Sequence, residues 1–309
     1  MNLRNIAKTA VSSVLRRSLA GIIGQQTGRR VILCFHSVHP NANHSSIKPD
    51  DFDKILSWLA ENTDLVPINQ LLTLDRGDNP RPSVAITFDD GHRDNLTHAL
   101  PIVLNYGATF AVYLTVGVTE NDPRARKRFS AVLRQPDTYL EDFEALSWND
   151  AEKLLDRGCS VGSHSWDHPM LSHLPDHAID FQLRESKRII QQRLGISNIG
   201  MCYPYGKLNR QVDKRVIEAT EKIGYSYGLC VEHRAISDRD SRFAIPRIII
   251  NHSNLERLKS QVLGAEDYHG LVSRYTPRLF SKQISPQDFN EVPHAPLPAM
   301  SRIGADLSE

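Results

Sequence analysis

The sequence predicts one α/β domain in which strands and helices alternate to form a barrel. Short apolar runs, rich in branched side chains, are separated by helix-length segments, and this alternation is typical of βα units. The chain has 309 residues, of which 40% are hydrophobic, so its length suits one α/β barrel of roughly 250 residues with extensions at its ends. We find no internal repeat and no low-complexity tract.

The predicted elements follow in chain order. The apolar runs predict strands at residues 31–35, 84–88, 108–114, 160–162 and 245–250. The clearest helices are expected at residues 51–60, 148–156 and 178–194. The last of these is followed by Gly195, and glycine is the residue type that most often ends a helix.

Two adjacent carboxylates follow the second predicted strand. Asp89, Asp90 and Gly91 come directly after its last residue, Phe88, so both acids lie at the carboxyl end of a strand, where α/β folds bind substrates. An isolated buried charge is too costly to keep, and we therefore expect these acids to bind a cation or to accept hydrogen bonds. Neighbouring side chains of an extended chain point to opposite sides, so one acid can bind a metal while the other faces the reacting water.

Two histidines follow the predicted strand at 160–162. His164 and His168 are four residues apart, and Pro169 prevents a helix from continuing beyond them. Alone, such a pair is more often made of ordinary core or surface histidines than of metal ligands. Together with one carboxylate, two neutral imidazoles make a three-ligand set that leaves a coordination position for water, as in catalytic zinc sites. We therefore expect one divalent metal, with Zn²⁺ preferred and Co²⁺, Ni²⁺ or Fe²⁺ also suited to these ligands.

Three motifs resemble those of the polysaccharide deacetylase family, which is also called the NodB-homology family or carbohydrate esterase family four. The first two are Thr-Phe-Asp-Asp-Gly at 87–91 and His-Ser-Trp-Asp-His at 164–168. Tyr-Pro-Tyr-Gly at 203–206 is similar to the third motif, which lines the substrate groove. The resemblance covers roughly residues 30–265 and implies a distorted, incomplete (β/α) barrel of about seven strands.

The resemblance also implies the roles of the motif residues. It makes Asp90, His164 and His168 the metal ligands and Asp89 the general base. A backbone N–H near Tyr205 would then hold the oxyanion of the reaction. The implied activity is that of a hydrolase acting on carbon–nitrogen bonds other than peptide bonds, which removes an N-acetyl group from an amino sugar in a glycan or glycan precursor. Two alternatives stay open: a deacylase of O-acetyl, N-formyl or non-sugar amide substrates, and a glycan-binding member without turnover.

One position departs from the family pattern. Many members carry an arginine two residues before the proline of the third motif, where it orients the base, and here this position is Cys202. Arg247 lies between two apolar stretches, and we hypothesise that it replaces the missing arginine. The general acid is open between His252 and His36, each of which also suits an ordinary structural histidine. We expect Tyr205, Arg247 and His36 to contact the substrate.

Three segments differ in composition from the predicted barrel. Residues 1–29 contain no acidic residue and have the pattern of a basic amphipathic helix, which either lies on an anionic membrane surface or packs on the barrel. Residues 119–147 are rich in basic residues and predict an inserted loop. Residues 266–309 predict a C-terminal extension that is partly disordered. The catalytic domain is therefore expected at residues 30–265.

Charge and cysteine content restrict the partners and the compartment. The net charge of +1 argues against a general nucleic-acid binder, so no nucleic-acid partner is expected. The four cysteines show no disulfide-like spacing, which agrees with a reducing compartment. Residues 1–29 are neither a convincing signal peptide nor a transmembrane span. We therefore expect a cytoplasmic protein, with peripheral contact to the inner membrane face as a possibility for its N-terminal helix.

Overall fold

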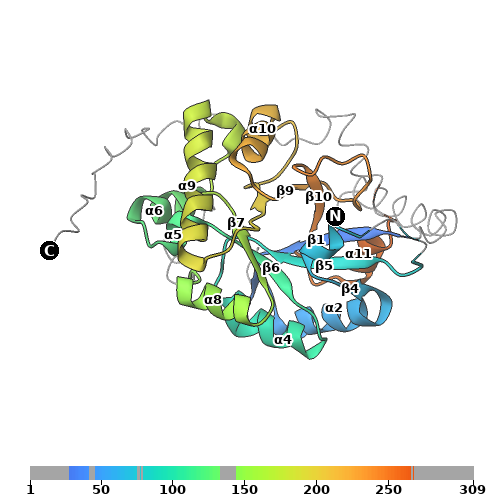
Figure 1. The fold of residues 1–309 in the computed structure, drawn as a ribbon. Coiled ribbons are helices and arrows are strands. Elements are labelled where there is room, and N and C mark those ends of the chain that lie inside the picture. Colours follow the sequence, from blue (N-terminus) through green and yellow to red (C-terminus); the bar gives the residue numbers. More distant parts are fainter. Residues whose placement is uncertain are drawn as a thin grey trace, which may run out of the picture. The chain divides into compact units, whose positions relative to one another are not determined.

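The computed structural model describes residues 28–41, 46–74, 77, 79–132, 144–265 and 267 (Figure 1). All of these belong to one compact unit, Met1–Leu271. The helix expected within residues 1–29 and the extension expected at 266–309 lie outside the described residues, apart from Gly28, Arg29 and Asp267. The proposed boundaries of these segments, and the membrane contact of the first, stay predictions.

Seven parallel strands form a closed barrel with helices around it (Figure 1). The strands are β1 (Arg30–Phe35), β5 (Ser83–Phe88), β6 (Phe110–Leu114), β7 (Ser160–Ser163), β8 (Met201–Cys202), β9 (Gly228–Val231) and β10 (Ile245–Ile249). β1 pairs with both β5 and β10, which closes the ring. The predicted (β/α) barrel of about seven strands is confirmed, and its most weakly paired seam joins β7 to β8 through Ser163 and Met201 alone.

Among the described residues, three further short strands lie outside this ring. β4 (Asp64–Leu65) pairs with the first residues of β5, and β2 (Ser37–Val38) pairs with β3 (Ser46–Ile47). The pair β2 and β3 follows directly on β1, so it continues the chain beyond the carboxyl end of the barrel strands. That end carries the sequence motifs.

Alternation along the strands separates a helix-facing core from the barrel interior. In β1, Val31, Leu33 and Phe35 belong to the core that the helices share, whereas Ile32 packs with the interior residues of other strands. Side chains of a strand point alternately to its two faces. The same alternation turns Cys34 into the interior, where its thiol and the guanidinium of Arg247 both contact Asp89.

Helices follow most of the strands and cover the barrel from outside (Figure 1). They are α2 (Pro49–Asn62), α3 (Ile68–Leu71), η1 (Asn95–Ala99), α4 (Leu100–Asn105), α5 (Val116–Thr119), α6 (Pro123–Val132), α8 (Trp148–Asp156), η2 (Leu171–His173), α9 (Asp176–Leu194), α10 (Lys214–Ile223) and α11 (Leu255–Val262). α8 begins with a capping box between Ser147 and Asp150, and α9 ends at Gly195, which is left-handed with φ 65°. All three predicted helices are confirmed to within two residues at each end.

Two strands of the barrel, β8 and β9, were not predicted. β8 has two residues and β9 begins with a glycine, so neither carries the branched apolar run that signals a strand. The expectation of a loop across residues 119–147 was wrong for Pro123–Val132, which form α6. Ala125 and Phe129, one helical turn apart, pack with Val118 in a small core of their own. Residues 133–143 lie outside the described part of the chain.

In the described part of the chain, no helix is both long and apolar enough to cross a membrane.

Candidate metal centre

The turn after β5 places both acids at the carboxyl end of the barrel strands. Asp90 has φ 72° and Gly91 has φ 77°, so two consecutive residues are left-handed and the chain turns sharply away from the strand. A Cβ on residue 91 would meet Leu114 at 2.9 Å, which explains why glycine stands there. Asp89 and Asp90 are both buried. The turn directs these neighbouring carboxylates toward different partners.

Asp90 faces two imidazoles. Its Oδ1 lies 3.6 Å from Nε2 of His164 and 3.6 Å from Nε2 of His168, which is too long for a hydrogen bond. Two ligand atoms bound tetrahedrally to one Zn²⁺ lie about 3.4 Å apart, given metal–ligand distances of about 2.0–2.1 Å. Asp90 Oδ1 is buried and has no hydrogen-bond partner among the described residues. The three residues therefore fit a shared divalent cation, as one carboxylate and two imidazoles should.

The two imidazoles are oriented by different contacts. The Nδ1–H of His164 donates to the carbonyl oxygen of Cys202 at 2.8 Å, which turns its Nε2 toward Asp90. Burial, together with the neighbouring His164, lowers the pKa of His168 to about 4, so its ring is neutral at neutral pH. The ring of His168 packs edge-on against Phe129 and Tyr205.

Asp89 is held by Arg247 inside the barrel. Nη1 and Nη2 of the guanidinium donate to Oδ1 and Oδ2 of Asp89, each at 2.8 Å, in a bidentate pair. Arg247 has no exposed surface, and its Nη1 also donates to the hydroxyl of Thr87 at 3.1 Å. Burial by itself raises the pKa of Asp89, but the charge and hydrogen bonds of Arg247, together with the nearby imidazoles, outweigh it and keep this pKa well below its usual range.

Two thiols complete the surroundings of Asp89. The Sγ of Cys34 lies 3.3 Å from Oδ2, and the Sγ of Cys202 lies 3.3 Å from both carboxylate oxygens. Burial raises the pKa of each thiol well above its usual value, so both keep their protons and can donate S–H to the carboxylate. Cys202 also accepts from Arg247 Nη2 at 2.6 Å. The position where the family pattern has arginine thus contacts both members of the ion pair.

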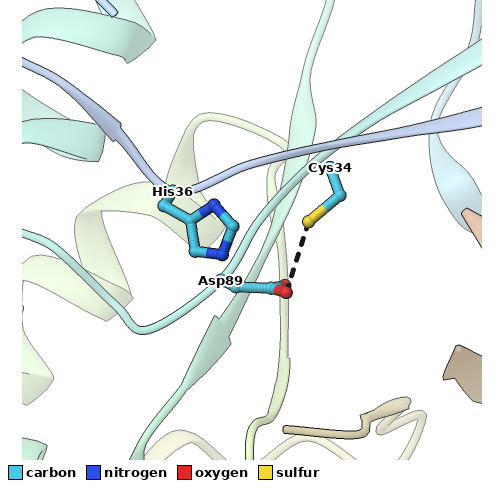
Figure 2. A group of neighbouring side chains, drawn as sticks. All are labelled: Cys34, His36 and Asp89. Carbon is cyan, nitrogen blue, oxygen red and sulfur yellow. Dashed lines mark hydrogen bonds between the residues drawn. The ribbon is translucent and has the colours of Figure 1, made fainter. Parts of the chain in front are cut away.

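His36 and His252, the two candidate acids, have different positions. His36 follows β1, and its ring faces Asp89 beside the thiol of Cys34 (Figure 2). Ligand atoms of His36, Cys34 and Asp89 all lie within 4.8 Å of one another. Burial lowers the pKa of His36. His252 lies in the turn between β10 and α11 and belongs to none of the three groups of described residues that could hold a metal ion.

The structure adds neighbours that sequence reasoning missed. Cys34 was not expected at the site. Its place one residue before the end of β1 nevertheless puts its side chain on the face of the strand that points into the barrel. His92 was also missed: it is buried, and its Nε2 lies 3.7 Å from Oδ2 of Asp90. Its position two residues after Asp90, across the glycine of the turn, was the available signal.

Two other groups have the spacing of metal ligands, but the positive charge of Arg247 beside them argues against a bound cation. They are Cys34 with His36 and Asp89, and Asp89 with His164 and Cys202. Asp89 belongs to both, and it is already neutralised by the guanidinium of Arg247. A cation bound there would lie beside a buried positive charge at a cost that these ligands do not offset. In the part of the chain that the structure describes, no guanidinium or ammonium group pairs with Asp90, the carboxylate of the third group.

Tyr205 borders the same centre. Its ring centroid lies 4.9 Å from that of His168, at an interplanar angle of 63°. Four residues at the centre other than glycine have positive φ: Asp90, Ser165, His168 and Tyr205. Strained backbone of this kind persists where the surrounding structure enforces it, and it concentrates at functional sites. The third motif therefore lies against the candidate metal ligands.

Comparison with known proteins gives the same family on independent grounds. The family model described as polysaccharide deacetylase matches residues 76–228, which include all three motifs. YxkH of Bacillus subtilis is 24% identical over 235 residues, which cover 75% of each chain. Poly-beta-1,6-N-acetyl-D-glucosamine N-deacetylase of Staphylococcus epidermidis is 22% identical over 225 residues, which cover 69% of this chain and 71% of that protein.

Solved structures show the same fold. The deacetylase PplD of Streptococcus pyogenes has a TM-score of 0.62 at 21% identity, covering 76% of this chain and 98% of that one. IcaB from Ammonifex degensii has a TM-score of 0.61 at 20% identity, covering 76% of this chain and 97% of that one. With the motifs, the match and the barrel in agreement, the chain is a hydrolase that belongs to the polysaccharide deacetylase family.

Proposed function

We propose that the protein removes an N-acetyl group from an amino sugar of a glycan or glycan precursor, with a divalent metal held by Asp90, His164 and His168. The equal separation of 3.6 Å between Asp90 Oδ1 and the two Nε2 atoms carries this proposal. It rests further on the contrast with Asp89, whose oxygens are held by Arg247 and which therefore stays available as a base.

Asp89 acts as the general base. When a divalent cation such as Zn²⁺ is bound, it supplies a lower pKa for a water molecule and polarisation of the amide carbonyl. Asp89 takes one proton from the attacking water as the new carbon–oxygen bond forms. Arg247 keeps the carboxylate in one orientation during this transfer, because two hydrogen bonds fix both of its oxygens. Arg247 is thus a positioning residue, since it has no exposed surface with which to touch a sugar.

His36 passes a proton to the leaving amine. As the carbon–nitrogen bond breaks, the nitrogen needs a proton, and the ring of His36 faces Asp89 at the same end of the barrel (Figure 2). Because burial lowers its pKa, His36 starts neutral, and it suits a group that takes the water's proton from Asp89 and passes it to the leaving nitrogen in the same turnover. Tyr205 contributes an aromatic edge to the wall of the site.

The substrate class is proposed from the relatives. Poly-beta-1,6-N-acetyl-D-glucosamine N-deacetylase of Staphylococcus epidermidis is named for a polymer of N-acetylglucosamine, which supports an N-acetylated amino sugar here. An O-acetyl, N-formyl or non-sugar amide substrate would use the same centre and is the alternative. These substrates differ in the acyl group and its linkage, so a substrate panel separates them.

The test is acetate release with metal as the variable. We expect protein loaded with Zn²⁺ to release acetate from β-1,6-linked N-acetylglucosamine oligomers or acetylated chito-oligosaccharides, and chelator-treated protein to release none until Zn²⁺ is restored. O-acetylated sugars and N-formyl amino sugars are assayed in parallel. Turnover of these alone would move the proposal to the alternative, and activity that survives complete removal of metal would overturn the metal-dependent reaction.

Two histidine variants test the acid. His36→Gln should reduce kcat by about 10²–10⁴-fold, the range for loss of a positioned acid or base, with little change in bound metal. His252→Gln is the matched control and should leave kcat near the wild-type value. The opposite ranking would assign the acid to His252.

A further inference from the structure

The two histidine ligands differ in how their rings are oriented, and the ring of His168 is oriented less directly than that of His164. Its Nδ1 is buried and has no hydrogen-bond partner among the described residues, whereas Nδ1 of His164 is fixed by the carbonyl of Cys202. The direction of the His168 ring must therefore come from its packing and from the backbone that carries it. That backbone is left-handed at both Ser165 and His168, with φ 68° and 60°. A strained loop needs external partners to keep its shape.

Helix α9 supplies the central partner through Gln182. Its Oε1 accepts from the backbone N–H of Trp166 at 2.9 Å and of Asp167 at 3.3 Å. Its Nε2 donates to Oδ1 of Asp167 at 2.6 Å. Gln182 is 3% exposed, so these bonds do not compete with bulk water. One amide therefore holds both residues that immediately precede His168.

Helices α5 and α6 hold the other side of this loop. The N–H groups of Val116 and Gly117, at the start of α5, donate to the carbonyls of Ser165 and Trp166 at 3.0 and 2.8 Å. Nη1 of Arg128 on α6 donates to Oδ2 of Asp167 at 2.7 Å. Asp167 is thus held from α9 through one oxygen and from α6 through the other.

We propose that Gln182, assisted by Arg128, is a positioning residue for the metal centre: it holds the loop at 164–168 in the shape that aims His168 at Asp90. The inference rests on the proposed metal centre and extends it to two helices that contribute no ligand. Residues that orient metal ligands from outside typically change metal affinity by about 10–100-fold when they are lost. Gln182 is buried and neither residue is a candidate metal ligand, so metal affinity is where their effect should appear.

The experiment measures Zn²⁺ affinity of the full chain by competition with a chromogenic chelator. Gln182→Ala should raise the Kd for Zn²⁺ about 10–100-fold. Gln182→Glu keeps the shape but loses the N–H donor and places a second carboxylate against Asp167, so its Kd should rise at least as much. Arg128→Ala should give a smaller increase, because the Arg128 side chain is 38% exposed and its ion pair is partly screened. The absorption spectrum of Co²⁺-loaded protein should change in the two Gln182 variants.

Two matched controls lie on the same helices. Gln191→Ala on α9 and Lys127→Ala on α6 remove exposed side chains and should leave both Kd and spectrum unchanged. Wild-type affinity in Gln182→Ala and Gln182→Glu would overturn the inference, even if their thermal stability falls. If neither Gln182 variant folds, Arg128→Ala decides, and unchanged affinity in it overturns the inference. A wild-type chain that binds no Zn²⁺ would instead overturn the proposed centre itself.

Discussion

Asp89 and Asp90 are neighbours in the chain and equally buried, yet their surroundings are opposite. Asp89 is surrounded by donors: the guanidinium of Arg247 and the thiols of Cys34 and Cys202. Asp90 faces imidazoles whose Nε2 atoms lie beyond hydrogen-bond distance, and its Oδ1 has no partner among the described residues. One carboxylate is neutralised by the protein, whereas the other is arranged for a cation.

The difference shows how a single turn separates two roles. A buried carboxylate must be compensated, because an isolated buried charge is expensive. Arg247 compensates Asp89 permanently, so that residue can remain a base without binding metal. Among the described residues, Asp90 has no cationic side chain within ion-pair distance other than histidine, so a metal ion is the compensation that its site suits. Exchanging the surroundings of the two acids would exchange their roles.

Asp90→Asn should have the largest effect, because it removes the one carboxylate from the ligand set. We expect the purified variant to retain no stoichiometric Zn²⁺, and acetate release to fall to background. The rise in melting temperature that Zn²⁺ gives the wild-type chain should disappear, since a ligand stabilises only the state that binds it. Metal content after gel filtration and thermal unfolding with and without Zn²⁺ check this. One equivalent of tightly held Zn²⁺ in the variant would contradict the assignment.

Asp89→Asn is the matched control for that variant and the second prediction. It should keep one equivalent of Zn²⁺ while kcat falls by about 10²–10⁴-fold, the contribution of a positioned base. The change also leaves Arg247 buried without its counter-charge, so the free energy of unfolding should fall by about 3–5 kcal/mol. Steady-state kinetics, metal content and urea denaturation separate these effects. Loss of Zn²⁺ equal to that in Asp90→Asn would mean that both acids bind the metal.

Arg247→Met tests whether the guanidinium is what distinguishes the two acids. Without it Asp89 is a buried carboxylate that has lost its bidentate ion-pair partner, and the free energy of unfolding should again fall by about 3–5 kcal/mol, with kcat reduced as well. Because Cys202 already touches both members of the pair, adding Cys202→Arg should restore part of the stability and turnover. In the wild-type background Cys202→Arg should be harmful, since it places two guanidinium groups on one carboxylate.

A double-mutant cycle gives the coupling between positions 202 and 247. We expect the double variant to be more stable than the summed changes in unfolding free energy of the two single variants predict. Its kcat should likewise exceed the product of their two fold-changes. Additive effects would mean that an arginine from β8 cannot reach Asp89 in this barrel, and that the guanidinium must come from β10.

The sequence predicted those parts of the site that are local in the chain. Asp89 and Asp90 follow one apolar strand, and His164 and His168 stand four residues apart, so motif and spacing were enough to propose them. The long periodic helices were recovered for the same reason, because a repeated apolar pattern is a strong local signal. Arg247 was proposed from its apolar context, and the structure brings its guanidinium to Asp89.

The remaining features depend on contacts across the barrel, which no local pattern reveals. Strand β8 is two residues long, and its place in the ring follows from its neighbours β7 and β9 rather than from its own propensity. The thiol of Cys34 reaches Asp89 only because β1 and β5 are paired in register, with Cys34 opposite Thr87. Gln182 lies in the middle of a long helix, where a polar residue gives no sign that it holds a loop of another segment.

Cys34→Ala should have the smallest effect, and it tests in the most detail how the surroundings of Asp89 differ from those of Asp90. It removes one neutral S–H donor from Asp89 while Arg247 and Cys202 remain, and such a bond contributes about 0.5–1.5 kcal/mol. Turnover should fall only a few-fold and bound Zn²⁺ should not change. Cys34→Ser keeps a donor and should retain more activity than the alanine variant, while Cys159→Ala, a buried thiol outside the site, serves as the control for lost packing. Equal activity in the serine and alanine variants would mean that the guanidinium alone defines the surroundings of Asp89, and that the thiol only fills space.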